Sequence, residues 1–151
     1  MVVYRISKTE YAKNISGEGS KKFGGRWNHP GIACLYCAAS RSLAVLEFSA
    51  NVSLELLPKS LSIIQIEIPD DSWIEIPINK LPPGWSSHPS PPQSREFGTK
   101  LLTRAETLCI KIPSAIIPEE YNYLINPLHK DFGKVKVKSV EDFVFDHRVK
   151  E

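Results

Sequence analysis

The stretch of this chain with the clearest chemical potential is a glycine-rich segment around one arginine. It reads Phe23-Gly24-Gly25-Arg26-Trp27-Asn28-His29-Pro30-Gly31. Glycines let the backbone take conformations that are closed to other residues and let it approach a ligand closely. The Arg26 guanidinium carries five donors in a planar fork that matches the paired oxygens of a phosphate. The segment therefore predicts either a phosphate-binding loop or a surface turn with a solvated arginine.

A second candidate is Glu47, an acid on a predicted helix. Ser40 is the expected N-cap of this helix, which runs to about Asn51. Three apolar side chains fall on one face of it: Leu43, Leu46 and Ala50. Glu47 lies along the edge of that face, turned toward the body of the protein. Since a buried Glu is rare without a paired cation or a task, we expect either an ion pair with a core arginine or a catalytic carboxylate.

Other polar residues stand near predicted strand ends. Arg5 lies in the first predicted strand and shares a face with Val3, so it points either to solvent or into a cleft. Tyr36 is the one large amphipathic residue of an apolar run and fits either a core or a platform for a flat ligand. Ser114 follows a proline that ends a strand, and Asn126 precedes a proline, as turn-forming amides often do.

The hydrophobic pattern predicts the elements that position these residues. We expect strands at residues 1–6, 32–38, 61–68, 73–76, 108–112, 134–140 and 143–145. We expect helices at 40–51 and from a capping box at 90–93 to about 106. Residues 7–22 fit a loop or a short helix, and 77–92 fit a long surface loop. Without regular βαβ alternation, the pattern predicts one α+β domain over residues 1–151, with two small packed β-sheets and flanking helices.

Composition limits the classes of function. The 151 residues are 42% hydrophobic and 24% charged, with no signal peptide or long apolar span, so we expect a cytoplasmic protein that does not enter a membrane. A net charge of +2 argues against nucleic-acid binding. Three cysteines give no paired disulfide framework. Cys34 and Cys37 would point to opposite faces of a strand, so we expect no metal site there.

Together these residues resemble the RES domain family. The shared positions are Gly24-Gly25-Arg26-Trp27-Asn28, Gly31, Tyr36, Leu43-Ala44-Val45-Leu46-Glu47, Pro113-Ser114, Asn122-Tyr-Leu-Ile-Asn126-Pro127-Leu128-His129 and Asp146-His-Arg148. The resemblance extends over nearly the whole chain. The family is named after an Arg, a Glu and a Ser. By position these correspond to Arg26, Glu47 and Ser114, with Arg5, Tyr36 and Asn126 as further candidates for the pocket.

The resemblance implies a bacterial toxin of a type II toxin-antitoxin pair that degrades NAD+, with a fold similar to ADP-ribosyltransferases. It also implies a helix-turn-helix antitoxin of the Xre type that blocks the active site. Toxins of this kind often pair as dimers bridged by the antitoxin. NAD+ would be the substrate, and we expect no prosthetic group and no metal.

On this hypothesis Glu47 stabilises the positive charge that develops on ribose when the bond to nicotinamide breaks. Arg26 and Arg5 would grip the diphosphate, Tyr36 would stack on or orient nicotinamide, and Ser114 would bond a ribose or amide oxygen. The acceptor stays open, because water, phosphate and a protein side chain could each reach the anomeric carbon. A non-catalytic module that sequesters a nucleotide or a partner is the alternative from another class.

Overall fold

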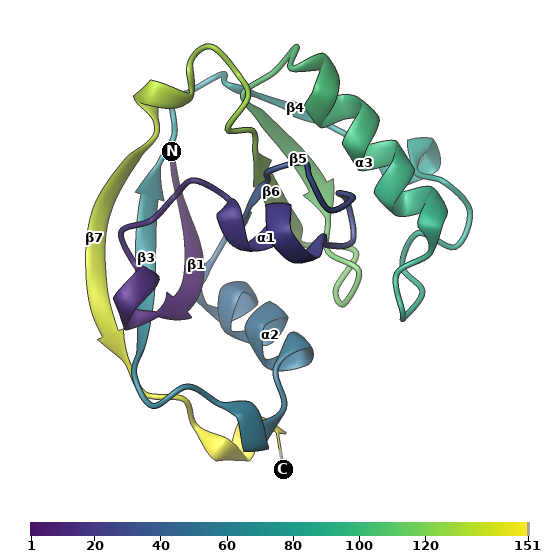
Figure 1. Ribbon diagram of the computed structural model, residues 1–151. Helices are drawn as coiled ribbons and strands as arrows, with labels where there is room; N and C mark the ends of the chain where they lie inside the picture. The colour runs from purple at the N-terminus through teal and green to yellow at the C-terminus, as the bar shows by residue number, and fades with distance from the viewer. Residues whose placement is uncertain (151) are drawn as a thin grey trace.

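The computed structural model describes residues 1–150 and contains a seven-stranded mixed sheet with three α-helices around it (Figure 1). The strands are β1 (Val2–Lys8), β2 (Leu35–Ala38), β3 (Leu61–Glu67), β4 (Trp73–Glu75), β5 (Cys109–Pro113), β6 (Tyr121–Ile125) and β7 (Lys136–Phe143). The helices are α1 (Glu18–Phe23), α2 (Arg41–Asn51) and α3 (Pro92–Arg104). The strand order is β4-β5-β6-β2-β1-β3-β7, and β4 with β5 is the parallel pair of an otherwise antiparallel sheet.

The prediction of two packed sheets is wrong, because one sheet runs through the domain. Its two wings, β7-β3-β1 and β2-β6-β5-β4, are joined between β1 and β2 by a single register pair, Tyr4 with Ala38. By contrast, β1 and β3 pair along seven positions, from Val2 with Glu67 to Lys8 with Leu61. Short strands without regular βαβ alternation do not show whether they form one sheet or two. Helices and strands do mix without regular alternation, as expected.

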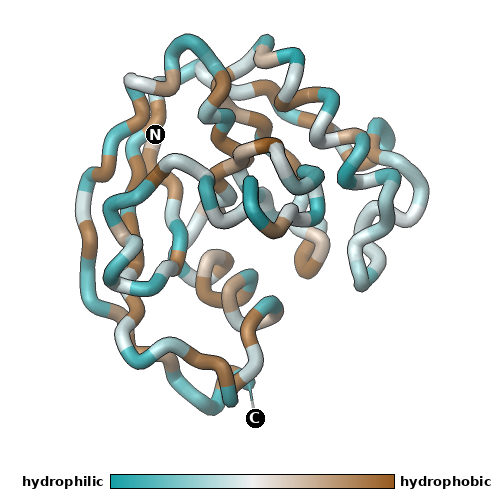
Figure 2. The backbone as a smooth tube through the Cα atoms, viewed as in Figure 1, coloured by the Kyte–Doolittle hydropathy of each residue, from teal (hydrophilic) through white to brown (hydrophobic). Residues whose placement is uncertain are grey.

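The core consists of three clusters on the two faces of this sheet. The largest contains Val3, Cys37, Ile64, Ile66 and Ile125, which alternate along their strands with residues of the opposite face. A second cluster lies between α3 and the β5-β6 pair and includes Trp27, Leu102 and Ile110. The third lies under α2. Figure 2 shows hydrophobic segments concentrated along the strands, whereas the loop before α3 is pale or hydrophilic.

Most element predictions are confirmed, with three exceptions. The capping box at residues 90–93 does not form: α3 begins after Pro91, and no side chain caps it. β7 is one continuous strand where two were expected. β6 was not predicted as a strand, although it pairs with both β2 and β5 and is mostly buried. The amides and the proline around it are typical of turns and concealed its apolar pattern.

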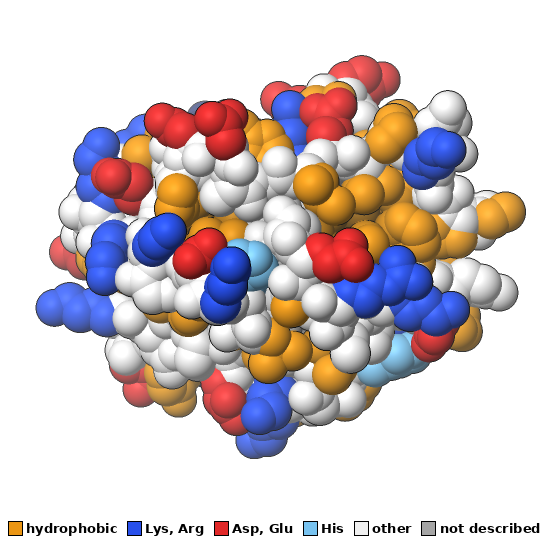
Figure 3. Space-filling view, turned by 90° about the horizontal axis from the view of Figure 1, so that it is seen from above, with side chains coloured by type: hydrophobic (Ala, Val, Ile, Leu, Met, Phe, Trp, Pro, Cys, Tyr) orange, Lys and Arg blue, Asp and Glu red, His pale blue; other side chains and the backbone are white. Residues whose placement is uncertain are grey.

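The surface carries both signs of charge. On the face shown in Figure 3, Lys and Arg side chains are interspersed with Asp and Glu. The same view shows an orange hydrophobic area between charged groups. Within residues 1–150, every helix is too short or too polar to cross a lipid bilayer.

Candidate functional site

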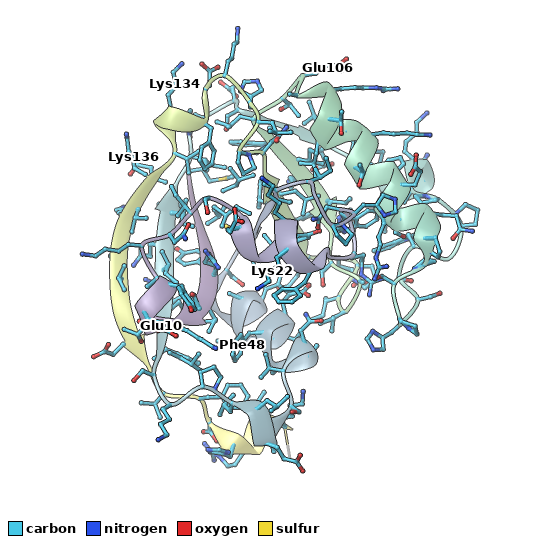
Figure 4. The ribbon with its side chains drawn as sticks, in the orientation of Figure 1. Glu10, Lys22, Phe48, Glu106, Lys134 and Lys136 are labelled. Carbon is cyan, nitrogen blue, oxygen red and sulfur yellow. The ribbon has the colours of Figure 1, made fainter. Side chains whose placement is uncertain are left out.

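Helix α2 is fixed at both ends and along one face, and this determines the direction of Glu47. The Ser40 hydroxyl caps the helix by accepting a hydrogen bond from the Leu43 N–H at 3.1 Å, as the sequence predicts. Leu43 and Ala44 are buried against Ala38, with Tyr4, Ile6 and Leu46 packed around them. At the far end, Lys150 donates to the carbonyls of Ser49 and Val52. Phe48, labelled in Figure 4, makes an edge contact with Phe145 at a centroid distance of 6.2 Å.

The Glu47 carboxylate forms hydrogen bonds with one residue of the turn after β5 and one residue of β6. Its Oε1 accepts a hydrogen bond from the Ser114 hydroxyl at 2.7 Å and another from Asn122 Nδ2 at 2.7 Å. Ser114 directly follows β5, and Asn122 lies on β6. The prediction that Glu47 faces the protein body is confirmed. Within residues 1–150 its Oε2 accepts no hydrogen bond, and no Arg or Lys forms a salt bridge with it.

The Ser114 hydroxyl donates one hydrogen bond and accepts two within the protein. It is completely buried, and its backbone N–H donates to the Glu120 carbonyl at 2.8 Å, which closes the turn between β5 and β6. Its oxygen accepts hydrogen bonds from the N–H groups of Ile116 and Ile117 at 3.1 and 3.2 Å. A hydroxyl has one hydrogen, and here Glu47 receives it. The expected bond from Ser114 to a ribose or amide oxygen is therefore replaced by a bond that orients Glu47.

Arg26 faces the same region from the glycine-rich loop. Its Nη1 donates to the carbonyls of Trp85 and Ser87, both at 2.8 Å, so the guanidinium ties this loop to the segment before α3. Partial burial lowers the pKa of Arg26 below its usual value, and the nearby Glu47 carboxylate opposes this shift only in part. The carboxylate and the guanidinium thus influence each other without forming an ion pair. Within residues 1–150, Nε and Nη2 of Arg26 make no hydrogen bond.

Tyr36 holds the glycine-rich loop in place. Its hydroxyl donates to Asn28 Oδ1 at 2.5 Å and accepts a hydrogen bond from the Trp27 N–H at 3.1 Å. Burial raises the pKa of Tyr36 well above its usual value, so the phenol stays protonated as a donor. A Cβ on Gly25 would lie 2.7 Å from the Tyr36 hydroxyl, so no side chain fits at this position. The loop conformation that presents Arg26 therefore depends on both residues.

Arg5, which the sequence suggests as a pocket residue, does not enter this network. Arg5 donates from Nη1 to the Asn14 carbonyl at 3.1 Å, and burial lowers its pKa while Cys37 raises it. It shares a sheet face with Val3, whereas Tyr4 faces α2.

Asn126 is a structural residue, and its nomination for the pocket is corrected by the structure. Its side chain is 1% exposed, and Nδ2 donates to the Leu102 carbonyl at 2.9 Å. Its Oδ1 accepts a hydrogen bond from the Leu128 N–H at 3.0 Å. Both ends of the amide are therefore bonded to backbone, and Asn126 links α3 to the end of β6.

Sequence reasoning missed two residues at the site. Asn122 was noted only as part of a family motif, because an amide beside tyrosines carries no periodic signal of its own. Arg95, on α3, donates from Nε to the Gly25 carbonyl at 3.2 Å and so brings a second guanidinium beside Arg26. Its nearness to the loop depends on the packing of α3, where a Cβ on Gly98 would lie 2.0 Å from the Trp27 carbonyl.

Glu47, Ser114 and Arg26 line neither of two open surface hollows of about 520 Å³. One is lined by Lys150 and by residues 50–55, at the end of α2 and in the segment that follows it. The other is lined by His29, Pro82 and four residues of α3 that include Phe97, together with Pro92 at the start of that helix. Within residues 1–150, no group of three His, Cys, Asp or Glu side chains could hold a metal ion. Cys34 and Cys37 are buried in different clusters.

Known proteins resemble this chain along nearly its whole length. A protein named Toxin Res from Yersinia enterocolitica is 37% identical over 153 residues, which cover 99% of this chain and 100% of that protein. A Prs ADP-ribosylating toxin from Sphingobium sp. (strain YBL2) is 36% identical over 146 residues, covering 95% of this chain and 91% of that protein. A Toxin Res from Pseudomonas putida is 36% identical over 152 residues, with 99% of each chain covered.

The fold also matches a solved structure. A chain in the crystal structure of the M. tuberculosis MbcT-MbcA toxin-antitoxin complex superposes with a TM-score of 0.74 at 17% identity, covering 95% of this chain and 84% of that chain. At this identity the likeness concerns the fold. The sequence profile of the RES domain matches residues 2–146. This match, together with the identities above 30%, shows that the chain belongs to the RES domain family.

Proposed function

We propose that this protein is the toxin of a toxin-antitoxin pair and that it cleaves the bond between nicotinamide and ribose in NAD+. The observation that carries this proposal is the Glu47 carboxylate, whose Oε1 is anchored by Ser114 and Asn122 while Oε2 accepts no hydrogen bond within residues 1–150. A carboxylate held in this way can face a cationic centre that forms during a reaction. The names of the relatives from Yersinia enterocolitica and Sphingobium support the assignment as a toxin.

The proposed reaction needs few groups. When the bond breaks, its electron pair moves to the pyridinium nitrogen, so nicotinamide leaves neutral and the ribose carbon becomes an oxocarbenium-like cation. Because the leaving group is already activated, no strong general acid is required, and none is evident around Glu47. Glu47 Oε2 stabilises the ribose cation, and the donors of Arg26 that are not bonded to the protein hold the diphosphate. Tyr36 positions the loop that carries Arg26.

The acceptor decides the class of enzyme. Attack by water gives ADP-ribose and releases a proton, whereas attack by inorganic phosphate gives ADP-ribose 1″-phosphate. Incubation of the purified protein with NAD+, with and without phosphate, followed by identification of the ribosyl product, separates the two. We expect stoichiometric release of nicotinamide in at least one condition. The proposal is refuted if NAD+ stays intact with and without phosphate and also after soluble proteins of a cell extract are added as acceptors.

Transfer of ADP-ribose to a protein is a second candidate, favoured by the name of the Sphingobium relative, a Prs ADP-ribosylating toxin. The same site would serve, with a protein side chain as the acceptor. Labelled NAD+ in a cell extract that contains soluble proteins tests this candidate. A labelled protein band that Glu47→Gln abolishes supports transfer, and nicotinamide release without any labelled band supports hydrolysis or phosphorolysis.

We further propose an antitoxin partner of the Xre helix-turn-helix type. The fold match to a chain of a toxin-antitoxin complex supports a protein partner. Expression of the chain alone should arrest growth and lower cellular NAD+, and co-expression of its antitoxin should reverse both. Arrest that persists with Glu47→Gln would contradict an enzymatic toxin and favour a binding module.

A further inference from the structure

The Asn122 side chain bonds to Glu47 and makes no other hydrogen bond within residues 1–150. It lies on β6, opposite Ala38 of β2 and Ile112 of β5. Its Nδ2 donates to Glu47 Oε1 at 2.7 Å. Its Oδ1 is buried and has no hydrogen-bond partner within residues 1–150. One half of the amide is therefore strongly bonded, and the other half is not bonded at all.

This arrangement is unfavourable for stability alone. A buried carbonyl without a hydrogen bond loses its water and gains nothing in return, and native proteins contain few such groups. The reverse orientation of the amide would place Oδ1 against the carboxylate oxygen, where two acceptors repel each other. Asn126, four residues further along the chain, shows the contrast, because both ends of its amide are bonded to backbone.

The geometry of the two donors shows what the amide contributes. Ser114 and Asn122 both donate to Oε1, and they come from different elements, the turn after β5 and strand β6. One donor alone would leave the carboxylate free to turn about that bond. Two donors on one oxygen fix the plane of the group and direct Oε2 away from both.

We propose that Asn122 is a positioning residue, which rests on the proposed function: its side-chain amide orients the Glu47 carboxylate so that Oε2 faces the ribose of NAD+. Asn122 acts through Glu47 and does not touch the substrate, since its own oxygen is buried. The residue therefore affects the chemical step and leaves NAD+ binding nearly unchanged.

The test compares Asn122→Ala and Asn122→Asp with Asn51→Ala as the matched control. Asn51 is an exposed asparagine on α2 whose Nδ2 donates to the backbone carbonyl of Glu47 at 2.8 Å, not to its carboxylate. In Asn122→Ala we expect kcat for nicotinamide release to fall about 10- to 100-fold, the effect of one lost charge-assisted hydrogen bond. KM for NAD+ should stay within about threefold. The Tm should change little, because alanine also removes the unbonded carbonyl.

Asn122→Asp keeps the shape of the side chain but puts an acceptor beside Oε1, so we expect at least as large a loss of kcat. Asn51→Ala should keep kcat. In the Glu47→Gln background, Asn122→Ala should cause no further loss of kcat, because the two residues act as one unit. An equal fall in both backgrounds, or a raised KM with an unchanged kcat, overturns the inference.

A crystal structure of Asn122→Ala separates this inference from the proposed function. We expect the Glu47 carboxylate to turn or to occupy more than one conformation. If the wild-type protein does not consume NAD+, the proposed reaction fails, yet this structure still tests the positioning role. A carboxylate that keeps its place and its bond to Ser114 in a single conformation refutes that role.

Discussion

Replacement of Glu47 by glutamine separates the charge of the carboxylate from its hydrogen bonds. The side-chain oxygen of glutamine can still accept from Ser114 and Asn122 at the position of Oε1, and its NH₂ group takes the place of Oε2. The fold is therefore retained, and the negative charge is lost. Charge-assisted hydrogen bonds contribute about 1.5–3 kcal/mol and neutral ones about 1 kcal/mol. Weakening two such bonds lowers the free energy of unfolding by about 1–4 kcal/mol. Each kcal/mol corresponds to a fall in Tm of about 2–4 °C for a domain of this size.

The effect on the reaction is expected to be larger. Removal of one electrostatic contact to a developing charge usually costs about 10²- to 10³-fold in kcat, or about 3–4 kcal/mol. KM for NAD+ should change by less than about threefold, because Arg26 and its loop, the proposed binding groups for the diphosphate, are intact. Initial rates of nicotinamide release over a range of NAD+ concentrations measure both constants, and thermal unfolding checks the fold. A Glu47→Gln protein with wild-type kcat refutes the role of the carboxylate.

Three other predictions concern the loop, the turn and the thiols. Gly25→Ala should raise KM for NAD+ and destabilise the protein by about 1–3 kcal/mol, because its Cβ would lie 2.7 Å from the Tyr36 hydroxyl. Gly19→Ala is the control, because a Cβ at this position meets nothing within 4 Å. It should be neutral or stabilising in thermal unfolding. Ser114→Ala should lower the free energy of unfolding by about 2–5 kcal/mol in urea titrations, because it leaves two turn N–H groups without an acceptor and removes one of the two donors to Glu47 Oε1. A change below the error of the titration would contradict the described network. The three buried cysteines should not react with a disulfide reagent in the native protein at pH 8 and should give three equivalents after denaturation. Burial raises the pKa of Cys37 to about 12 and that of Cys109 to about 11. These values exceed the unfolded thiol pKa of about 8.5, so the thiols of the unfolded chain deprotonate at a lower pH than those of the folded protein. Deprotonation therefore favours the unfolded chain, and the Tm should fall as the pH rises above about 8.5. Replacement of Cys109 by Ala should reduce that fall.

Local patterns predicted the elements that are amphipathic by themselves. The helix of Ser40 to Asn51 and the strand at Leu61 were evident from caps and alternation. The register of the sheet was not predictable, since it depends on pairings such as Tyr4 with Ala38 across 34 positions of the chain. Strand β6 was missed because asparagines at 122 and 126 and the proline at 127 favour turns, and its identity as a strand comes from its pairing with β2 and β5.

The candidate site was predictable where a residue conflicted with its own element. Glu47 was identified because an acid on the edge of an apolar face needs an explanation, and Arg26 because three glycines surround it. Asn122 gave no such conflict, since an asparagine on a partly buried strand is ordinary. Arg95 lies on a helix, and its hydrogen bond to the Gly25 carbonyl depends on where that helix packs in the folded protein. Sequence can show an unusual residue but not the ordinary residues that support it.

The hydrogen count at Ser114 restricts how this site can recognise a substrate. The hydroxyl has one hydrogen, which Glu47 receives, and its oxygen already accepts two backbone N–H groups. The amide of Asn122 is directed to the same carboxylate. Among Glu47, Ser114 and Arg26, the groups that make no hydrogen bond within residues 1–150 are Oε2 of Glu47 and Nε and Nη2 of Arg26. These two groups carry opposite charges and approach without pairing, as a ligand with a cationic and an anionic part requires. In the reaction that we propose, NAD+ brings a cationic nicotinamide ribose to Glu47 and an anionic diphosphate to Arg26.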